Sequence, residues 1–211
     1  MLDIVNKLDL HNKNIFDIGC YDGTFLSLIK NRDNNFYGID ASDYAVRKAR
    51  EKGINVKKFF FDDKSKIPFR KSFFDLIIAG EIIEHIYDTD FFLDEIYRLL
   101  KRDGSFILST PNLASFGRRL MLLLGLNPII EVSPNEENSS GHIRYFVKNT
   151  LVTLLIKHKF KIINLRSDVV NFDKNGSYKS KVLAKLLPSL GQSIICFCKK
   201  DSFLVITKTF L

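Results

Sequence analysis

Three apolar runs near the start of this chain each close on acidic side chains. The runs cover residues 14–18, 35–39 and 56–61, and the acids are Asp17, Asp40, Asp62 and Asp63. Runs of this length are typical of strands that are buried on both faces of a parallel sheet. Ligands of such sheets bind outside the carboxyl ends of the strands, so we expect these acids to face one crevice. A ligand that meets several carboxylates should be cationic or rich in hydrogen-bond donors.

The turn after the first run argues against a dinucleotide as that ligand. The fingerprint G-x-G-x-x-G requires glycine at two positions where the chain has Tyr21 and Thr24. Only Gly19 and Gly23 remain. A dinucleotide would also bring an anionic pyrophosphate to the acids. S-adenosylmethionine fits them better, because its ammonium and sulfonium groups are positive and its ribose and adenine donate hydrogen bonds.

The rest of the chain alternates apolar runs with helical periodicity. We expect strands over 14–18, 35–39, 56–61, 74–79, 105–110 and 160–166, and helices over 42–52, 89–101 and 147–158. Ser42 and Thr89 are the expected N-caps of the first two helices. Alternation of this kind predicts a doubly wound sheet with helices on both faces.

The chain ends in two apolar runs, 193–198 and 203–207, separated by polar residues 199–202. Only a tight turn fits between them, so we expect a hairpin and an antiparallel final strand. The predicted fold class is therefore α/β: a Rossmann-like, mostly parallel seven-stranded sheet with one antiparallel strand. We assign residues 1–211 to a single domain, because 45% apolar content in 211 residues suffices for one core.

Two polar and basic segments interrupt the pattern. Residues 112–141 leave the carboxyl end of the fifth strand and are interpreted as a lid insertion, and residues 171–192 as a second excursion on the substrate side. Arg118, Arg119 and the apolar run to Leu126 could lie in a lipid interface. A lid helix packed on the domain explains them as well, and we favour it. The lysines of the second excursion could grip an anionic acceptor, but a solvated helix face is the preferred interpretation.

Composition limits the partners only weakly. The formal charge is +8, which favours an anionic partner, but the basic residues are scattered and a solvated surface accounts for them. Cys20, Cys196 and Cys198 lack C-x-x-C spacing, which argues against a zinc site or a disulfide framework. We see no signal peptide and no run long enough to span a bilayer, so we expect a cytoplasmic protein.

Several segments carry a family resemblance. Asp17, Gly19 and Gly23 resemble motif I of the class I S-adenosylmethionine-dependent methyltransferases, D-x-G-x-G-x-G, with Tyr21 at the middle glycine. Residues 81–85 read E-I-I-E-H, residues 99–112 read L-L-K-R-D-G-S-F-I-L-S-T-P-N, and residues 141–146 read G-H-I-R-Y-F. These segments resemble the E-x-x-E-H, L-K-P-G-G … S-T-P-N and G-H-x-R-x-F signatures of the ubiquinone-biosynthesis-type enzymes, over roughly residues 14–166.

The resemblance implies which residues hold the cofactor. They are Asp17, Gly19, Cys20, Tyr21, Gly23, Asp40, Ala41, Asp62, Asp63, Gly80 and Glu81. Asp17 would meet the methionine ammonium, Asp40 the ribose hydroxyls, and either Asp62 or Asp63 the adenine amine. Glu81, with the glycine before it, would line the sulfonium side.

The same resemblance implies the catalytic residues. His85, with Glu84 beside it, is the candidate general base, since a histidine pKa of about 6.5 lies near working pH. A histidine that only holds the turn is the alternative. Glu81, Glu84 and His85 also resemble the metal ligands of the 3′-terminal small-RNA 2′-O-methyltransferases, which add a later histidine. This chain offers His142 as that histidine, but alignment of the G-H-x-R-x-F segment on Phe146 places Arg144 at the ligand position, and arginine cannot ligate a metal. We therefore predict no metal site and keep a divalent ion as the alternative.

The predicted function is methyl transfer from S-adenosylmethionine to an oxygen, or with less support a nitrogen, of a small or lipid-linked acceptor. One alternative is an RNA 2′-O-methyltransferase, which the net charge and the partial metal set suggest, but no RNA-binding module is recognised and nucleic acid is not the expected partner. A second alternative is a cofactor-binding or regulatory protein without catalysis. Peripheral membrane contact stays open, and the sequence gives no oligomeric state.

Overall fold

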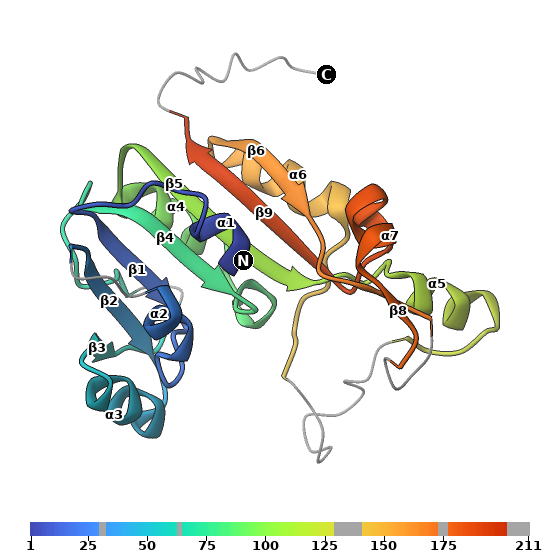
Figure 1. Cartoon of the computed structure of the whole chain (residues 1–211), viewed down its shortest axis with the longest axis horizontal. Coiled ribbons are helices and arrows are strands. Elements are labelled where there is room, and N and C mark those ends of the chain that lie inside the picture. The colour runs from blue at the N-terminus through green and yellow to red at the C-terminus, as the bar shows by residue number, and fades with distance from the viewer. Residues whose placement is uncertain (30–32, 63–64, 129–140, 173–176, 202–211) are drawn as a thin grey trace.

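The computed structural model describes residues 1–29, 33–62, 65–128, 141–172 and 177–201, and it is built on one seven-stranded sheet (Figure 1). The strands, in spatial order, are β3 (Asn55–Lys58), β2 (Asn35–Asp40), β1 (Asn14–Ile18), β4 (Phe74–Gly80), β5 (Leu100–Pro111), β9 (Ser193–Lys200) and β6 (Phe160–Arg166). Strands β1 to β5 are parallel to one another, and β9 is antiparallel to β5 and β6. The predicted fold class is confirmed. The strand order reverses between β1 and β4, which is where an open sheet binds its ligand.

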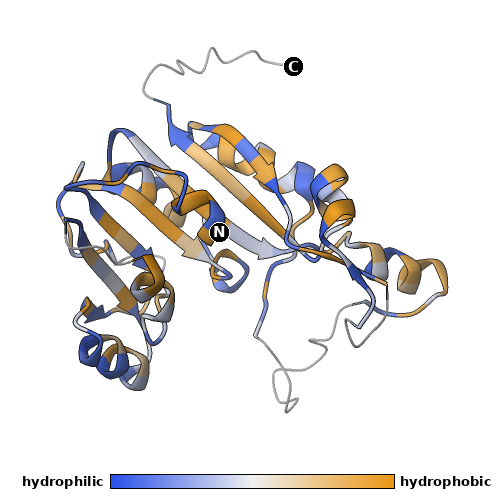
Figure 2. Cartoon of the chain, viewed as in Figure 1, coloured by the Kyte–Doolittle hydropathy of each residue, from blue (hydrophilic) through white to orange (hydrophobic). Residues whose placement is uncertain are grey.

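Helices cover both faces of this sheet. They are α1 (Leu2–Val5), α2 (Thr24–Ile29), α3 (Asp43–Glu51), α4 (Thr89–Leu99), α5 (Phe116–Leu123), α6 (Lys148–Lys157) and α7 (Lys181–Leu186), with 3-10 turns η1 (Ile83–His85) and η2 (Pro188–Leu190). Phe16 of β1 packs in the core that contains Phe92 of α4 and Leu151 of α6, whereas its neighbour Ile15 packs in the opposite core with Leu26 of α2. The apolar strands between the two helix layers stand out in Figure 2. Among the described helices, none is long and apolar enough to cross a bilayer.

The boundaries of the two crossover helices test the predicted caps. In α3, the Ser42 hydroxyl accepts the Ala45 N–H at 3.3 Å, as predicted. In α4, the N-cap is Asp88 rather than Thr89, because the Asp88 carboxylate accepts the Phe91 N–H at 2.9 Å. This helix ends at residue 99, short of the predicted 101, because the next residue already pairs with β4 as the start of β5.

The predicted C-terminal hairpin is wrong in its turn. β9 continues through Lys199 and Lys200, where the turn was expected, and its antiparallel direction comes from its insertion between β5 and β6. Lys200 stays in the strand because its ammonium donates to the carbonyl oxygens of Tyr97 and Leu100, at 2.6 and 2.8 Å. The second predicted run, 203–207, lies outside the described residues. The third predicted strand, 56–61, is also shorter than expected and ends at residue 58.

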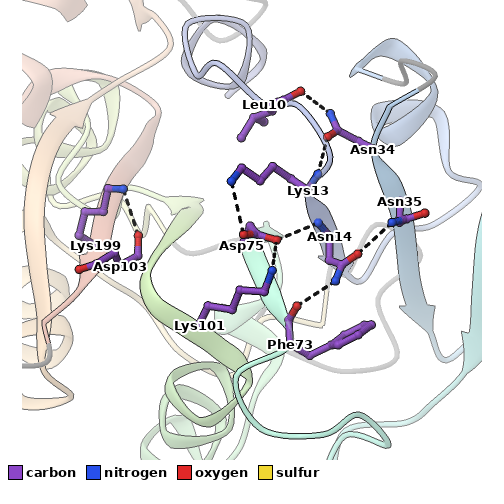
Figure 3. A network of polar contacts seen from close by, with 10 residues as sticks. All are labelled: Leu10, Lys13, Asn14, Asn34, Asn35, Phe73, Asp75, Lys101, Asp103 and Lys199. Atoms are coloured by element: carbon purple, nitrogen blue, oxygen red, sulfur yellow. Dashed lines mark hydrogen bonds and ion pairs between the residues drawn. The ribbon is translucent and has the colours of Figure 1, made fainter.

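A polar network closes the sheet at the amino ends of its strands (Figure 3). The Asp75 carboxylate accepts the backbone N–H of Asn14 at 3.0 Å and the Lys101 ammonium at 2.7 Å, with the Lys13 ammonium 3.8 Å away. The Asn14 side chain donates to the Phe73 carbonyl at 3.1 Å. These groups satisfy one another and tie β1, β4 and β5 together, so this end of the sheet is organised for stability.

The two predicted insertions meet beyond the carboxyl end of the sheet. The lid segment contains α5, and the second excursion contains α7 together with the short strands β7 (Val170–Asn171) and β8 (Lys179–Ser180). The rings of Phe116 and Phe172 lie 5.4 Å apart, so the two segments pack against each other. The part of the lid from 129 to 140 lies outside the described residues.

Candidate active site

The turn that joins β1 to α2 requires glycine at its first position. Gly19 has φ +72°, and a Cβ there would lie 2.9 Å from the Ile82 Cδ1 atom. The Gly19 N–H donates to the Ile39 carbonyl at 2.9 Å, which fixes the turn to β2. A larger residue would be strained by this left-handed φ and would have to displace the Ile82 side chain.

The middle of the same turn is left-handed without a glycine. Tyr21 has φ +47°, a conformation that costs an L-residue roughly 1–2 kcal/mol, and its side chain is 62% exposed. The Asp40 carboxylate compensates, because one oxygen accepts the Tyr21 N–H at 2.8 Å and the other accepts the Ser42 N–H at 2.9 Å. Asp40 therefore holds the end of β2 against the turn after β1.

Asp17 is the buried acid of this edge. Burial, with a smaller contribution from the nearby Asp40, raises the pKa of the Asp17 carboxyl to about 8. Within the part of the chain that the structure describes, no side-chain or backbone donor bonds to it. A buried carboxyl without a donor is well suited to receive one from a ligand, and a cationic donor would favour its ionised form.

A cavity of about 240 Å³ lies over this turn. Its lining residues are Met1, Asp17, Gly19, Cys20, Tyr21, Asp22, Thr24, Phe25, Ile78 and Gly80. Five of them are predicted cofactor residues: Asp17, Gly19, Cys20, Tyr21 and Gly80. The sequence analysis missed the others. Asp22 and Thr24 could have been found, since they lie within and directly after the glycine turn, but nothing in the sequence indicated that Met1 would reach Gly80.

The remaining predicted cofactor residues do not line the cavity. Gly23 and Glu81 are next to lining residues in the sequence, Asp40 is the last residue of β2, and Ala41 follows it. Asp62 is exposed, and its carboxylate accepts the Ser65 hydroxyl at 3.0 Å and the Ser65 N–H. Asp63 lies outside the described residues.

A second cluster begins at the carboxyl end of β4. Glu81 is left-handed, with φ +52°, and accepts the Ser109 hydroxyl at 2.8 Å. Glu84 is buried, and one carboxylate oxygen accepts the Thr110 hydroxyl at 2.9 Å. Its other oxygen, Oε1, has no hydrogen-bond partner among the described residues. Burial raises the pKa of Glu84 to about 7 although its hydrogen bonds act in the opposite direction, and burial likewise raises the pKa of Glu81 against its bond from Ser109.

Two histidines face this orphan oxygen. His142 Nε2 lies 3.9 Å from Glu84 Oε1, and the His85 and His142 rings lie 4.9 Å apart. His85 Nδ1 lies 3.1 Å from the Gly141 carbonyl oxygen. A carbonyl only accepts, so Nδ1 carries the hydrogen and Nε2 keeps a lone pair for a proton or a metal.

The structure brings together a metal-ligand set that the sequence alignment did not. One ligand atom each from Glu84, His85 and His142 lies within 4.8 Å of the others. Arg144, which the alignment put at the ligand position, instead donates from Nε to the Ile86 carbonyl at 3.0 Å. It anchors the segment, and His142 is placed beside Glu84 because the Glu84 carbonyl accepts the N–H groups of residues 143 and 144.

Comparisons with known proteins find methyltransferases among the similar sequences and structures. Residues 16–108 match the family model described as "Methyltransferase domain". The ubiquinone biosynthesis O-methyltransferase of Pelagibacter ubique is 34% identical over 113 residues, which are 49% of this chain and 44% of that protein. The human mitochondrial protein named arginine-hydroxylase NDUFAF5 is 25% identical over 186 residues, which are 87% of this chain and 51% of that protein. The chain thus spans about half the length of these curated relatives.

A solved structure shares the whole fold. The crystal structure of an S-adenosylmethionine-dependent methyltransferase from Thermotoga maritima, described as a possible histamine N-methyltransferase, has a TM-score of 0.67 and 21% identity. The match covers 95% of this chain and 87% of that one. The similarity supports the sheet topology and the order of the elements around it.

Proposed function

We propose that this chain is a class I S-adenosylmethionine-dependent methyltransferase of the ubiquinone-biosynthesis type and that it methylates an oxygen of a small or lipid-linked acceptor. One observation carries the proposal. Gly80 lines the cavity over the glycine turn, and the next residue, Glu81, begins the cluster of acids and imidazoles. A sulfonium methyl group beside Gly80 would therefore lie near side chains that can accept a proton from a hydroxyl group. Positioning alone can contribute about 7–11 kcal/mol to such a displacement.

The cofactor would be held by the acids of the first two strands. Asp17 would take the ammonium group, whose positive charge would offset the cost of ionising a buried carboxyl. Asp40 uses one lone pair on each oxygen for the backbone, so it keeps lone pairs for the two ribose hydroxyls. The adenine would extend past Ala41 toward Asp62 and Asp63.

His85 would act as the general base. Its Nε2 lone pair is free to take the acceptor proton, while the hydrogen bond to the Gly141 carbonyl fixes the ring. Glu84 is buried beside it and would stabilise the imidazolium that forms, as an ionised carboxylate. His85 would thus transfer the proton, and Glu84 would compensate the charge.

The same cluster also fits a divalent cation. Glu84 Oε1 is buried without a hydrogen-bond partner, and a carboxylate with two imidazoles is a common donor set for such ions. Glu84, His85 and His142 would hold the ion, which would lower the pKa of the acceptor hydroxyl. Binding of Mn²⁺, followed by electron paramagnetic resonance, tests this directly: an ion held by these residues is lost in His142→Ala, and an ion held elsewhere is not.

Exposed apolar side chains near the acceptor side favour a lipid-linked acceptor or contact with a membrane surface. On and after α5, Leu122, Leu123 and Leu124 are 58%, 81% and 72% exposed, and on α7 Val182 and Leu186 are 70% and 71% exposed. Arg118 and Arg119 lie on the same helix as the first leucines. Apolar and basic groups on neighbouring helices suit a prenyl-like tail or an interface.

Methyl transfer is tested by following S-adenosylhomocysteine, the product that forms whichever acceptor is methylated. Purified protein is incubated with labelled S-adenosylmethionine and, separately, with a panel of catechols of different tail length, total lipid extract or total RNA. Labelled catechol or lipid together with S-adenosylhomocysteine supports the proposal. Label in RNA would support the 2′-O-methyltransferase alternative, and cofactor binding without transfer to any acceptor would support a regulatory role. Because a relative is named for arginine hydroxylation, release of S-adenosylhomocysteine is the required readout.

A further inference from the structure

A second cavity, of about 500 Å³, opens between α1, the carboxyl end of β6 and α7. The charged residues that line it are Lys7, Arg166, Lys181, Lys185, Asp3 and Asp168. We call it the basic cavity, because its four cations exceed its two acids. None of these residues belongs to the predicted cofactor or catalytic set.

The lysines of the basic cavity form no ion pair within the described ranges, whereas one of its acids already accepts hydrogen bonds. Among the described residues, no ion pair joins Lys7, Lys181 or Lys185 to a carboxylate. Asp168 accepts the Ser193 N–H at 3.0 Å and the Ser167 hydroxyl at 3.3 Å. The two acids offset only part of the charge, so the four cations leave the cavity wall with a net positive charge.

The two lysines of α7 stand in a costly arrangement. Lys181 and Lys185 are one helical turn apart, and like charges at this spacing destabilise a helix. The first turn of α7 contains no acid to offset them. On α3, by contrast, Lys48 pairs with Glu51 at 2.8 Å. An anion bound between Lys181 and Lys185 would remove the repulsion.

The basic cavity adjoins the proposed reaction centre. Met1, the N-cap of α1, lines the cofactor cavity, and Asp3, two residues later in α1, lines the basic cavity. On the other side, Asp168 is close enough to Glu81 to add to the effect of burial in raising the pKa of that carboxyl. A molecule could therefore reach from one cavity to the other along the carboxyl edge of the sheet.

We propose that the basic cavity binds an anionic group, a phosphate or a carboxylate, of the methyl acceptor while the reacting hydroxyl lies at Glu84 and His85. The acceptor class is then an anionic one, and Lys181 and Lys185 are specificity residues that do not touch the cofactor. This inference rests on the proposed function. The anion can belong to a soluble acceptor or to a lipid headgroup, and both present the same chemistry to the lysines.

The first arm of the test uses inorganic phosphate, followed by ³¹P NMR at constant ionic strength. The double variant Lys181→Glu/Lys185→Glu should bind phosphate at least tenfold more weakly than the wild type. A matched control, Lys71→Glu/Lys161→Glu, makes the same charge change at two exposed lysines outside the cavity and should stay within twofold. Equal weakening in the two double variants would show a general charge effect and overturn the proposal.

The second arm uses phosphatidylcholine vesicles with and without phosphatidylglycerol, in a co-sedimentation assay. Phosphate binding that depends on the cavity lysines, with vesicle binding that does not, supports a soluble anionic acceptor. Vesicle binding that depends on both phosphatidylglycerol and the cavity lysines supports a lipid headgroup. If neither ligand distinguishes the cavity variant from the control, the proposal is wrong. S-adenosylhomocysteine binding is measured on all three proteins, so failure of the cofactor site is seen separately from failure of the basic cavity.

Discussion

The cofactor half and the acceptor half of the carboxyl edge are built in different ways. The cofactor half comes from nearly consecutive residues, 17–24, which one acid from the neighbouring strand, Asp40, fastens by a hydrogen bond. The acceptor half is assembled from three distant segments that contribute Glu84, Thr110 and His142. A compact turn of this kind is a local pattern that the sequence displays, whereas an assembled cluster depends on how distant segments pack. We therefore propose the cofactor for the first half from sequence and structure together, and the acceptor for the second half from the structure.

The largest expected effect separates the two halves by function. His85→Ala should lower the methyl-transfer rate by about 10²–10⁴-fold, the usual contribution of a general base, and leave S-adenosylhomocysteine affinity unchanged. His11→Ala is the matched control, since His11 is exposed at the amino end of β1. Initial rates with a working acceptor measure the effect. Equal rates for the two variants would remove His85 from the mechanism.

The pH dependence of stability distinguishes the buried acid of the cofactor half. Asp17 has a folded pKa of about 8, above the unfolded value near 3.9, so the folded state binds the proton more tightly. Stability should be fully present below about pH 4 and fall as the pH rises toward 8, by up to about 1.4 kcal/mol per pH unit. Asp17→Asn should flatten this slope in urea unfolding curves of the ligand-free protein. The same slope in both proteins would mean that Asp17 is not the group that titrates.

Asp40, the proposed partner of the ribose hydroxyls, should have a smaller effect on stability that appears only when ligand is bound. S-adenosylhomocysteine at about 100 times its Kd should raise the free energy of unfolding of the wild type by roughly 2.7 kcal/mol. Asp40→Ala should lose most of this gain, because it removes the carboxylate that would accept hydrogen bonds from the ribose hydroxyls. The same substitution removes the hydrogen bond that the Tyr21 N–H donates to Asp40. Asp43→Ala, three residues away and exposed, should keep it. Thermal unfolding with and without ligand measures both, and a full gain in Asp40→Ala would contradict the assignment.

The smallest effect concerns strain in the glycine turn. Tyr21→Gly relieves a left-handed tyrosine but adds freedom to the unfolded chain, so stability should rise by at most about 1 kcal/mol. Tyr44→Gly, at an exposed position inside α3, should lower it by about 0.5–1 kcal/mol. Opposite signs in urea unfolding would confirm that backbone conformation, and not the loss of a tyrosine, decides the result.

The sequence predicted more of the cofactor half than of the acceptor half. Asp17, Gly19 and Gly80 were found because strand ends and glycine turns are local patterns, and all three line one cavity. His142 was set aside in favour of Arg144 on alignment, because its position beside Glu84 depends on where the Glu84 carbonyl holds a segment more than fifty residues away. The hairpin turn at Lys199 and Lys200 was wrong for a similar reason. A run of charged residues predicts a turn only when no distant group accepts hydrogen bonds from their side chains. Here the Lys200 ammonium donates hydrogen bonds to two backbone carbonyl oxygens, so the strand continues.

The central claim is that the carboxyl edge binds S-adenosylmethionine. The most direct measurement is calorimetric titration of the wild-type protein with S-adenosylhomocysteine and, in parallel, with NAD⁺. The account predicts saturable binding of S-adenosylhomocysteine and none of NAD⁺, because the acids at the strand ends attract cations and donors and the turn lacks the glycines that a pyrophosphate needs. Binding of NAD⁺, or no binding of S-adenosylhomocysteine at millimolar concentration, would contradict it.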